Sequence, residues 1–417
     1  MNTERIERLC TEAEEKLAPA FREIARISEK NTRKVLDAFK NARISATHFA
    51  ASDGYGYNDR GRELIDEVYA EVFGTEAAIV RHSIANGTHA LTIGLFGLLR
   101  PGDTLLSVTG ELYDTLKSVT EKKDGEGSLP DYGIAYRQID FKTVDGREEF
   151  DYEALEKTLA EDKSVKVVYV QRSRGYAGRR TLTSEEINRL ADFVHERCGA
   201  FVMVDNCYGE FVEETEPYRA DLLVGSLIKN PGGGMADAGG YLAGTRRAVE
   251  LASYRLTVPG IGGEVGATLG QNKNIFRGLF FAPHVVAEAI KTAQLAAYVF
   301  SALGYGVSPK AGEARHDIIQ IIELESAEAL CAFCRGIQAN SPIDSFLTPE
   351  PWDMPGYDDQ VIMAAGAFVG GSSIELSADG PLRPPYRVFL QGGLTYESGK
   401  CGIIGAACEV LNTKENK

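Results

Sequence analysis

The most informative part of the sequence is Asp221-Leu-Leu-Val-Gly-Ser-Leu-Ile-Lys229-Asn-Pro-Gly-Gly-Gly234. This apolar run ends in Ser-x-x-Lys and a glycine-rich turn, so it predicts a buried strand with a lysine just past its end. Ligands of α/β proteins bind at the carboxyl ends of parallel strands. We therefore interpret Lys229 as a Schiff-base lysine. A solvated lysine beside a flexible loop is the alternative, and it prevails for a lysine taken alone. The residues upstream reverse that preference.

Short apolar runs alternate with amphipathic helices on the amino-terminal side of this strand. The alternation predicts an α/β fold with a mostly parallel sheet covered by helices on both faces. The run Tyr241 to Ala243 is expected to return antiparallel. Thr183-x-x-Glu186 has the pattern of a capping box that opens a helix. The other expected strands are 77–80, 104–108, 165–170, 200–204 and 222–226, and the expected helices are 62–73, 87–99, 112–121, 152–160 and 183–198.

The segments on either side of this core suggest three parts. Residues 1–60 are expected to form a helical arm, continuing past Pro19 to about residue 41, and then a glycine- and tyrosine-rich loop. Residues 61–283 form the large domain. Residues 284–417 form a linking helix, 284–303, and a smaller α/β domain with helices at 327–337 and 360–367 and strands at 318–323 and 387–390.

Composition excludes several classes of protein. The chain has 417 residues, 44% hydrophobic and 25% charged, which are values of a globular protein. A net charge of -15 argues against a nucleic-acid partner, because phosphate backbones require clustered basic residues. No apolar run reaches membrane-spanning length, and the charged amino terminus lacks a secretory signal. Seven scattered cysteines fit a reducing compartment. We therefore expect a cytoplasmic protein without a membrane partner.

The pair Cys331-x-x-Cys334 has the spacing of a redox or metal site. It lies in an expected helix with no second Cys or His pair nearby, so we interpret it as two small buried residues one turn apart. No metal site is predicted.

Two further strand ends carry polar groups suited to a phosphorylated ligand. Gly87 and Thr88 follow a strand and open a helix, where unpaired backbone amides attract phosphate; an ordinary N-cap at Asn86 fits the same segment. Asp205 ends a buried strand, where a carboxylate is costly unless it is paired. The pyridine nitrogen of pyridoxal phosphate is a suitable partner, because an ionised Asp keeps it protonated. A structural ion pair or a Mg²⁺ ligand is the competing interpretation.

Other residues complete the set. Tyr113 follows a strand end, where its ring can stack on a cofactor, although many tyrosines only pack. The hydroxyl of Ser226 can reach a phosphate. Arg387 is a candidate for binding a substrate carboxylate in bidentate fashion, with Arg383 as its rival and an exposed structural arginine as the alternative.

Together these residues resemble the fold-type I pyridoxal phosphate enzymes, in particular the cystathionine and methionine lyases of the Cys/Met metabolism family. Within it they resemble the methionine gamma-lyase-like branch labelled aluminium-resistance protein, over roughly Tyr57 to Glu397. The resemblance implies that Tyr57 and Arg60 reach the phosphate of a neighbouring subunit. It assigns the phosphate turn to Gly87 and Thr88, the stacking ring to Tyr113, the pyridinium partner to Asp205, the Ser-x-x-Lys motif to Ser226 and Lys229, and the carboxylate arginine to Arg387.

Two positions depart from the lyase pattern. Ile228 stands where the lyases usually have threonine, which removes one hydroxyl from the phosphate site. The segment Gln171-Arg-Ser-Arg-Gly-Tyr176 stands where an asparagine normally contacts the cofactor, and this sequence is characteristic of the aluminium-resistance branch. Both departures leave the cofactor assignment intact and weaken the reaction assignment.

The resemblance implies a carbon-sulfur lyase acting on a sulfur-containing amino acid such as cystathionine or methionine. Lys229 would hold the cofactor as a Schiff base and, once released, take the Cα proton, with Tyr113 as candidate proton donor to the leaving thiol. The residues alone specify only an amino-acid substrate. An aldolase or aminotransferase with the same lysine and aspartate stays open, as does a non-catalytic cofactor-binding regulator. The family implies a homodimer or homotetramer with sites at the dimer interface.

Overall fold

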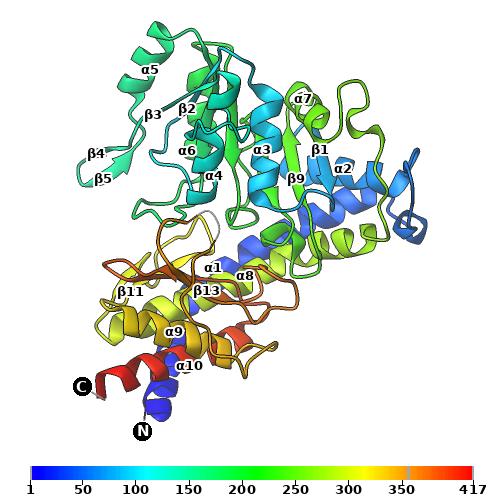
Figure 1. The fold of residues 1–417 in the computed structure, drawn as a ribbon. Coiled ribbons are helices and arrows are strands. Elements are labelled where there is room, and N and C mark those ends of the chain that lie inside the picture. The colour runs from blue at the N-terminus through cyan, green and yellow to red at the C-terminus, as the bar shows by residue number, and fades with distance from the viewer. Residues whose placement is uncertain (1, 355–356, 416–417) are drawn as a thin grey trace. The chain divides into compact units, whose positions relative to one another are not determined.

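The computed structural model describes residues 2–354 and 357–415, and the chain divides into two compact units. The seven-stranded unit comprises Lys34–Leu227 and Asp237–Phe276. The five-stranded unit comprises Met1–Arg33, Ile228–Ala236 and Arg277–Lys417. Two long helices, α1 (Asn2–Asn41) and α8 (Asn272–Ala302), contribute residues to both units (Figure 1).

The sheet of the seven-stranded unit has the order β1-β9-β8-β7-β6-β2-β3. The neighbours from β8 to β3 pair in parallel, whereas β9 pairs antiparallel with both β8 and β1. The antiparallel return expected at Tyr241 is thus confirmed. The strands are β1 (Ala77–Arg81), β2 (Thr104–Ser107), β3 (Ala135–Gln138), β6 (Val165–Gln171), β7 (Phe201–Asp205), β8 (Leu222–Ser226) and β9 (Gly240–Gly244), and a separate hairpin joins β4 (Lys142–Val144) to β5 (Arg147–Glu149).

Both faces of the central strands of this sheet are buried, as a mostly parallel sheet requires. Val167 and Tyr169 of β6 join the apolar cluster formed with α3, while Val168 and Val170 on the opposite face are equally inaccessible. Figure 1 shows α3 and α7 beside each other against the sheet, and their residues pack in the same cluster. The helices are α2 (Arg60–Phe73), α3 (Gly87–Leu98), α4 (Asp114–Thr120), α5 (Tyr152–Glu161), α6 (Ser184–His195) and α7 (Arg246–Leu256).

The capping box expected at Thr183 opens α6. The Thr183 hydroxyl accepts from the Glu186 amide at 3.0 Å, and the Glu186 carboxylate accepts from the Thr183 amide at 2.9 Å. Two amide groups of the first turn, which have no partner within a helix, are thereby satisfied.

The five-stranded unit holds an antiparallel sheet in the order β10-β11-β14-β13-β12. Its helices α9 (Ala327–Ala339) and α10 (Tyr396–Glu415) pack so closely that a side chain on Gly336 would collide with the backbone of Ala406. The elements are β10 (Gly306–Ser308), β11 (Gln320–Glu323), α9 (Ala327–Ala339), β12 (Val361–Ala364), β13 (Ser377–Pro381), β14 (Arg387–Gln391) and α10 (Tyr396–Glu415).

The structure corrects two expectations in this part of the chain and adds one helix that was not expected. The helix expected at 360–367 is wrong: Val361–Ala364 forms strand β12, which pairs with β13. The helix expected from His284 starts twelve residues earlier, at Asn272, and contains Pro283. Helix α10 was not predicted. Its spaced glycines weaken a helix signal, but they suit close packing against α9.

Cys331 and Cys334 both lie within α9, and both side chains are buried in the apolar core of the five-stranded unit. Their expected helical position and burial are confirmed. Across residues 2–354 and 357–415, no helix has a stretch that is both long and apolar enough to cross a lipid bilayer.

Candidate active site

Three adjacent parallel strands of the seven-stranded unit end in polar residues. Gln171 ends β6, Asp205 ends β7 and Ser226 ends β8, and Gln171 lies opposite Asp205 in the register. Side chains alternate along a strand, so these residues share a face with Tyr169, Met203 and Val224. Those three apolar residues belong to the cluster packed against α3. The strand ends thus present an amide, a carboxylate and a hydroxyl on the α3 face.

Asp205 is only 8% exposed, so its carboxylate needs compensating partners. Its Oδ1 accepts from the Cys207 amide at 3.1 Å, and its backbone oxygen accepts from the Arg172 amide at 3.1 Å. A second buried cation, Arg179, interacts electrostatically with it. Burial lowers the pKa of Arg179 to about 10, and the neighbouring Tyr169 and Asp205 oppose that fall. Arg179 therefore favours an ionised Asp205.

The amino terminus of α3 carries Gly87 and Thr88 in its first turn. Asn86 caps the helix, as the alternative interpretation held, but its side chain accepts from the His89 amide at 2.8 Å. That cap does not use the Gly87 and Thr88 amides, so it is compatible with an anion site. The Thr88 hydroxyl lies 2.8 Å from the Thr115 hydroxyl, which ties α3 to α4.

Tyr113 precedes α4, at the end of the loop that follows β2. Its amide donates to Gln171 Oε1 at 3.0 Å, and its ring lies 5.8 Å from the ring of Tyr176 at an angle of 60°. Tyr113 thus lies beside the end of β6, next to the strand that carries Asp205. The structure brings Tyr113, Gln171 and Asp205 into one region of the seven-stranded unit.

Ser226 is fully buried at the end of β8, and its hydroxyl lies 3.5 Å from the Gly239 carbonyl. That separation is long for a hydroxyl donor. The Ser226 hydroxyl is therefore only weakly engaged by this carbonyl.

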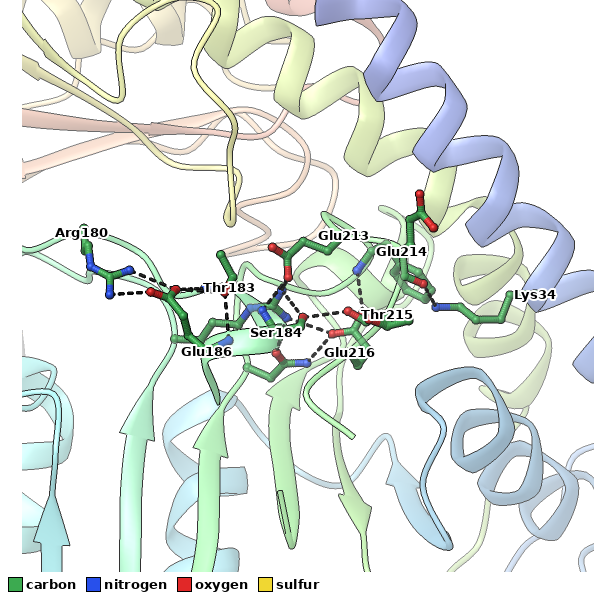
Figure 2. A network of polar contacts seen from close by, with 12 residues as sticks. Lys34, Arg180, Thr183, Ser184, Glu186, Glu213, Glu214, Thr215 and Glu216 are labelled. Carbon is green, nitrogen blue, oxygen red and sulfur yellow. Dashed lines mark hydrogen bonds and ion pairs between the residues drawn. The ribbon is translucent and has the colours of Figure 1, made fainter. Parts of the chain in front are cut away.

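A buried ion network that was not predicted from the sequence includes Ser184, Glu213 and Glu216 (Figure 2). Arg172 is 0% exposed, and its Nη1 donates to Asn206 Oδ1 at 2.7 Å and to Glu216 Oε2 at 3.0 Å. Its Nη2 donates to the Ser184 hydroxyl at 3.0 Å and to Glu213 Oε2 at 3.1 Å. The guanidinium thereby links the ends of β6 and β7 to the start of α6 and to the acidic loop 213–216.

The sequence carried a faint signal for this network. An arginine directly after a β-branched strand and the acidic run Glu213-Glu-Thr-Glu216 are both unusual at buried positions. The spacing of the arginine and the acidic run in the sequence does not indicate that they pair.

Lys229 belongs to the five-stranded unit, in the segment Ile228–Ala236 that leaves β8 and precedes β9. It is half-buried and caps the short 3₁₀ helix Asn230–Gly232, whose residues are buried. Side chains at Gly233 or Gly278 would collide with the facing backbone of α8 or of Gly232. The glycine-rich turn is thus packed directly on α8.

Arg387 opens β14 in the five-stranded unit and lies opposite Glu323 of β11. Its Nη2 lies 2.8 Å from Glu323 Oε1, and both side chains are about one-third exposed. The rival Arg383 pairs with Asp359 at 2.8 Å. Each arginine therefore has a carboxylate partner, and Arg387 is the more sheltered of the two.

Tyr57 and Arg60 are exposed on the seven-stranded unit, and the Tyr57 ring stacks on Tyr55 at 5.5 Å. The structure places neither beside Asp205. The loop that carries them is anchored by Asp59, which caps α2 by accepting a hydrogen bond from the Arg62 amide at 2.8 Å.

Arg62, only 2% exposed, strengthens the same anchor. Its Nη1 donates to the carbonyl oxygens of Gly56 at 2.6 Å and Gly266 at 2.9 Å. The Tyr57 loop is therefore fixed to the loop around Gly266, although its tyrosines face outward.

Comparison with known proteins agrees with this architecture. A methionine gamma-lyase family model matches residues 6–411. An uncharacterized protein of Bacillus subtilis, YnbB, is 48% identical over 413 residues, which cover 98% of this chain and 97% of YnbB.

Solved structures also resemble the chain. A carbon-sulfur lyase involved in aluminum resistance from Clostridium novyi NT is 51% identical, with a TM-score of 0.92 over 97% of this chain and 95% of that chain. The pyridoxal-5'-phosphate-dependent protein YhfS from Escherichia coli shares the fold at 16% identity, with a TM-score of 0.62 over 94% of this chain and 97% of that chain. The expected fold-type I architecture is confirmed. Since the family model spans nearly the whole sequence, the chain belongs to the methionine gamma-lyase family.

Proposed function

We propose that this protein is a pyridoxal-phosphate-dependent carbon-sulfur lyase that acts on a sulfur-containing amino acid. The observation that carries the proposal is the Asp205 carboxylate. It is buried at the end of β7, accepts one backbone amide and lies in the field of the buried Arg179 cation. An ionised carboxylate kept in this position suits a protonated pyridine nitrogen.

The residues on the α3 face fit the remaining parts of the cofactor. The first-turn amides of α3 at Gly87 and Thr88, with the Thr88 hydroxyl, suit its phosphate. The Ser226 hydroxyl, only weakly engaged by Gly239, is a further candidate for the phosphate. The Tyr113 ring would lie against the pyridine ring, and Lys229 would carry the cofactor covalently. When bound, the cofactor supplies an electron sink that stabilises negative charge at the substrate Cα.

The protein's own groups perform the proton transfers. Once released from its covalent bond, the Lys229 amine would take the proton from Cα, and the Tyr113 hydroxyl would donate to the leaving thiol. Arg387 would bind the substrate carboxylate, which requires it to exchange Glu323 for the substrate. Asp205 keeps its negative charge throughout. Elimination from Cβ or Cγ uses these same groups.

A second copy of the chain would complete the site. Tyr57 and Arg60 are exposed on a loop that Asp59 and Arg62 hold in place, which suits a contact with another subunit. Sedimentation of the cofactor-bound protein tests this assembly. A dimer or tetramer is expected, and a monomer that binds the cofactor tightly contradicts it.

The test of the reaction is a product assay with purified, cofactor-loaded protein. Cystathionine and methionine are each supplied, and 2-oxo acid and ammonia are measured alongside transamination to glutamate. The proposal expects pyruvate or 2-oxobutyrate with ammonia and a free thiol. Transfer of the amino group without release of ammonia indicates an aminotransferase instead. Wild-type protein that binds the cofactor but matches Lys229→Ala in every substrate assay indicates a non-catalytic binding protein.

A further inference from the structure

The turn that follows β6 holds Tyr113 on two sides. We call residues Gln171 to Tyr176 the Gln171 turn. Gln171 accepts from the Tyr113 amide through Oε1 at 3.0 Å, and its Nε2 donates to the Ser173 carbonyl at 3.1 Å. Its side-chain amide is therefore fixed at both ends. On the other side, the Tyr176 ring packs against the Tyr113 ring, with 5.8 Å between the ring centroids.

The same turn is tied to the loop that precedes Tyr113. The Gln171 amide donates to the Thr109 hydroxyl at 3.1 Å, and Arg179 donates to the Thr109 carbonyl. Arg179 also donates to the Glu111 carbonyl at 3.4 Å. Because the backbone that leads to Tyr113 is anchored, the ring orientation depends on what fills the space between Gln171 and Tyr113.

Gly175 occupies that space. Its φ of +56° is in the left-handed region, which favours glycine. A Cβ atom at this position would lie 2.9 Å from Gln171 Nε2 and 3.0 Å from Tyr113 Cδ2. Neither neighbour is free to withdraw, because the Gln171 amide has a partner at each end and Tyr176 lies against the ring. A methyl group must therefore displace the Tyr113 ring or break a Gln171 hydrogen bond.

We propose that Gly175 and Gln171 are positioning residues for Tyr113, and that the missing side chain at Gly175 sets the orientation of the Tyr113 ring. The inference rests on the proposed function, in which that ring lies against the cofactor. A shifted ring loses contact area with the pyridine ring and moves the phenol away from the leaving group, so cofactor affinity and turnover fall together. In enzymes a displacement of about 1 Å can reduce the rate by roughly a hundredfold.

The test compares Gly175→Ala with Gly133→Ala. Gly133 also has a positive φ, +73°, but a Cβ there meets no atom within 4 Å. Both variants carry backbone strain, and only Gly175→Ala pushes on Tyr113. The dissociation constant of pyridoxal phosphate is measured by spectroscopic titration, and the unfolding temperature is recorded for each variant. We expect Gly175→Ala to bind the cofactor about tenfold or more weakly than Gly133→Ala, with similar unfolding temperatures.

A double substitution separates positioning from a general structural defect. In a Tyr113→Ala background, adding Gly175→Ala should leave cofactor affinity unchanged, because the ring on which the methyl group acts is gone. Gln171→Met, which keeps the shape and removes both hydrogen bonds, should weaken cofactor binding in the same direction as Gly175→Ala.

The outcomes divide clearly. Equal affinities for Gly175→Ala and Gly133→Ala contradict this inference while the proposed function stands. An undiminished effect of Gly175→Ala in the Tyr113→Ala background also contradicts it. Wild-type protein that does not bind pyridoxal phosphate contradicts the proposed function and this inference with it.

Discussion

Arg172 Nη1 donates to Asn206 Oδ1 at 2.7 Å, and Asn206 directly follows Asp205 in the chain. The Arg172 amide also donates to the Asp205 carbonyl at 3.1 Å. One buried residue therefore holds the backbone of Asp205 and the side chain of its successor. The proposed cofactor partner at the end of β7 is therefore positioned by an ion network. The residues of that network are not proposed to contact the cofactor.

Replacing Arg172 by methionine should strongly destabilise the protein. The change removes the cation that pairs with Glu213 at 3.1 Å and Glu216 at 3.0 Å, and it leaves the buried Glu216 carboxylate without that cation. Losing one partner of a buried pair costs about 3–5 kcal/mol. Urea unfolding measures the change. Arg189→Met is the control, because Arg189 pairs with Glu185 in solvent, and its effect should stay below about 1 kcal/mol. Equal effects of the two substitutions would contradict a central role for Arg172.

Asp205→Asn should abolish most of the lyase activity while leaving the fold intact. The asparagine oxygen can still accept from the Cys207 amide, so the turn after β7 keeps its hydrogen bond. The neutral amide cannot hold a proton on the pyridine nitrogen, and the electron sink weakens. Loss of such preorganised electrostatic stabilisation typically costs about a hundredfold or more in kcat. Activity assays and circular dichroism check both parts, and a variant with full activity would rule out this role.

Asp59→Asn should change how stability depends on pH. Burial alone would raise the pKa of Asp59, but hydrogen bonds from Ser52, the Arg62 amide and Thr268 together lower it. A folded-state pKa below the unfolded value contributes stability above about pH 4, and that contribution disappears as the pH falls through the folded pKa.

The free energy of unfolding of wild type and Asp59→Asn should therefore differ near neutral pH and converge in acid. Asp37→Asn, at an exposed ion pair with Lys40, serves as the control and should show little difference from wild type at neutral pH. A gap between wild type and Asp59→Asn that widens in acid would have the wrong sign for this interpretation.

Substrate binding should distinguish Arg387 from Arg383. Arg387→Gln should raise KM for the amino acid about tenfold or more, because a charged hydrogen bond to the substrate carboxylate is worth about 1.5–3 kcal/mol. Arg383→Gln should leave KM within about twofold, since an exposed ion pair contributes little. Steady-state kinetics at saturating cofactor measures both. The reverse result would transfer the role to Arg383.

The parallel sheet was predictable because its signal is local. The β-branched strand at 165–170 and the apolar run before Ser226 identify themselves, and the capping box at Thr183 marks the start of α6. The run Val361–Ala364 was misassigned because four apolar residues fit a short strand and a helix segment equally well. The first part of α8 was not predicted because a proline such as Pro283 normally marks a helix boundary.

The site residues at the ends of strands could be predicted, because the sequence pattern shows where those strands end. Asp205 and Ser226 end the strands on which they were expected, and Gly87 and Thr88 open α3. Arg172 was missed because its partners Glu213 and Glu216 lie 41 and 44 residues away, and only the folded chain brings them together. The ion pair between Arg387 and Glu323 spans 64 residues and was invisible for the same reason.

The most direct test of the account is to locate the covalent link to the cofactor. Protein loaded with pyridoxal phosphate is reduced with borohydride and digested, and the modified peptide is identified by mass spectrometry. Lys229→Ala, treated in the same way, serves as the control. The account predicts the reduced cofactor on Lys229 of the wild type and on no peptide of the variant. A stable adduct on a different lysine, or none on the wild type, would contradict it.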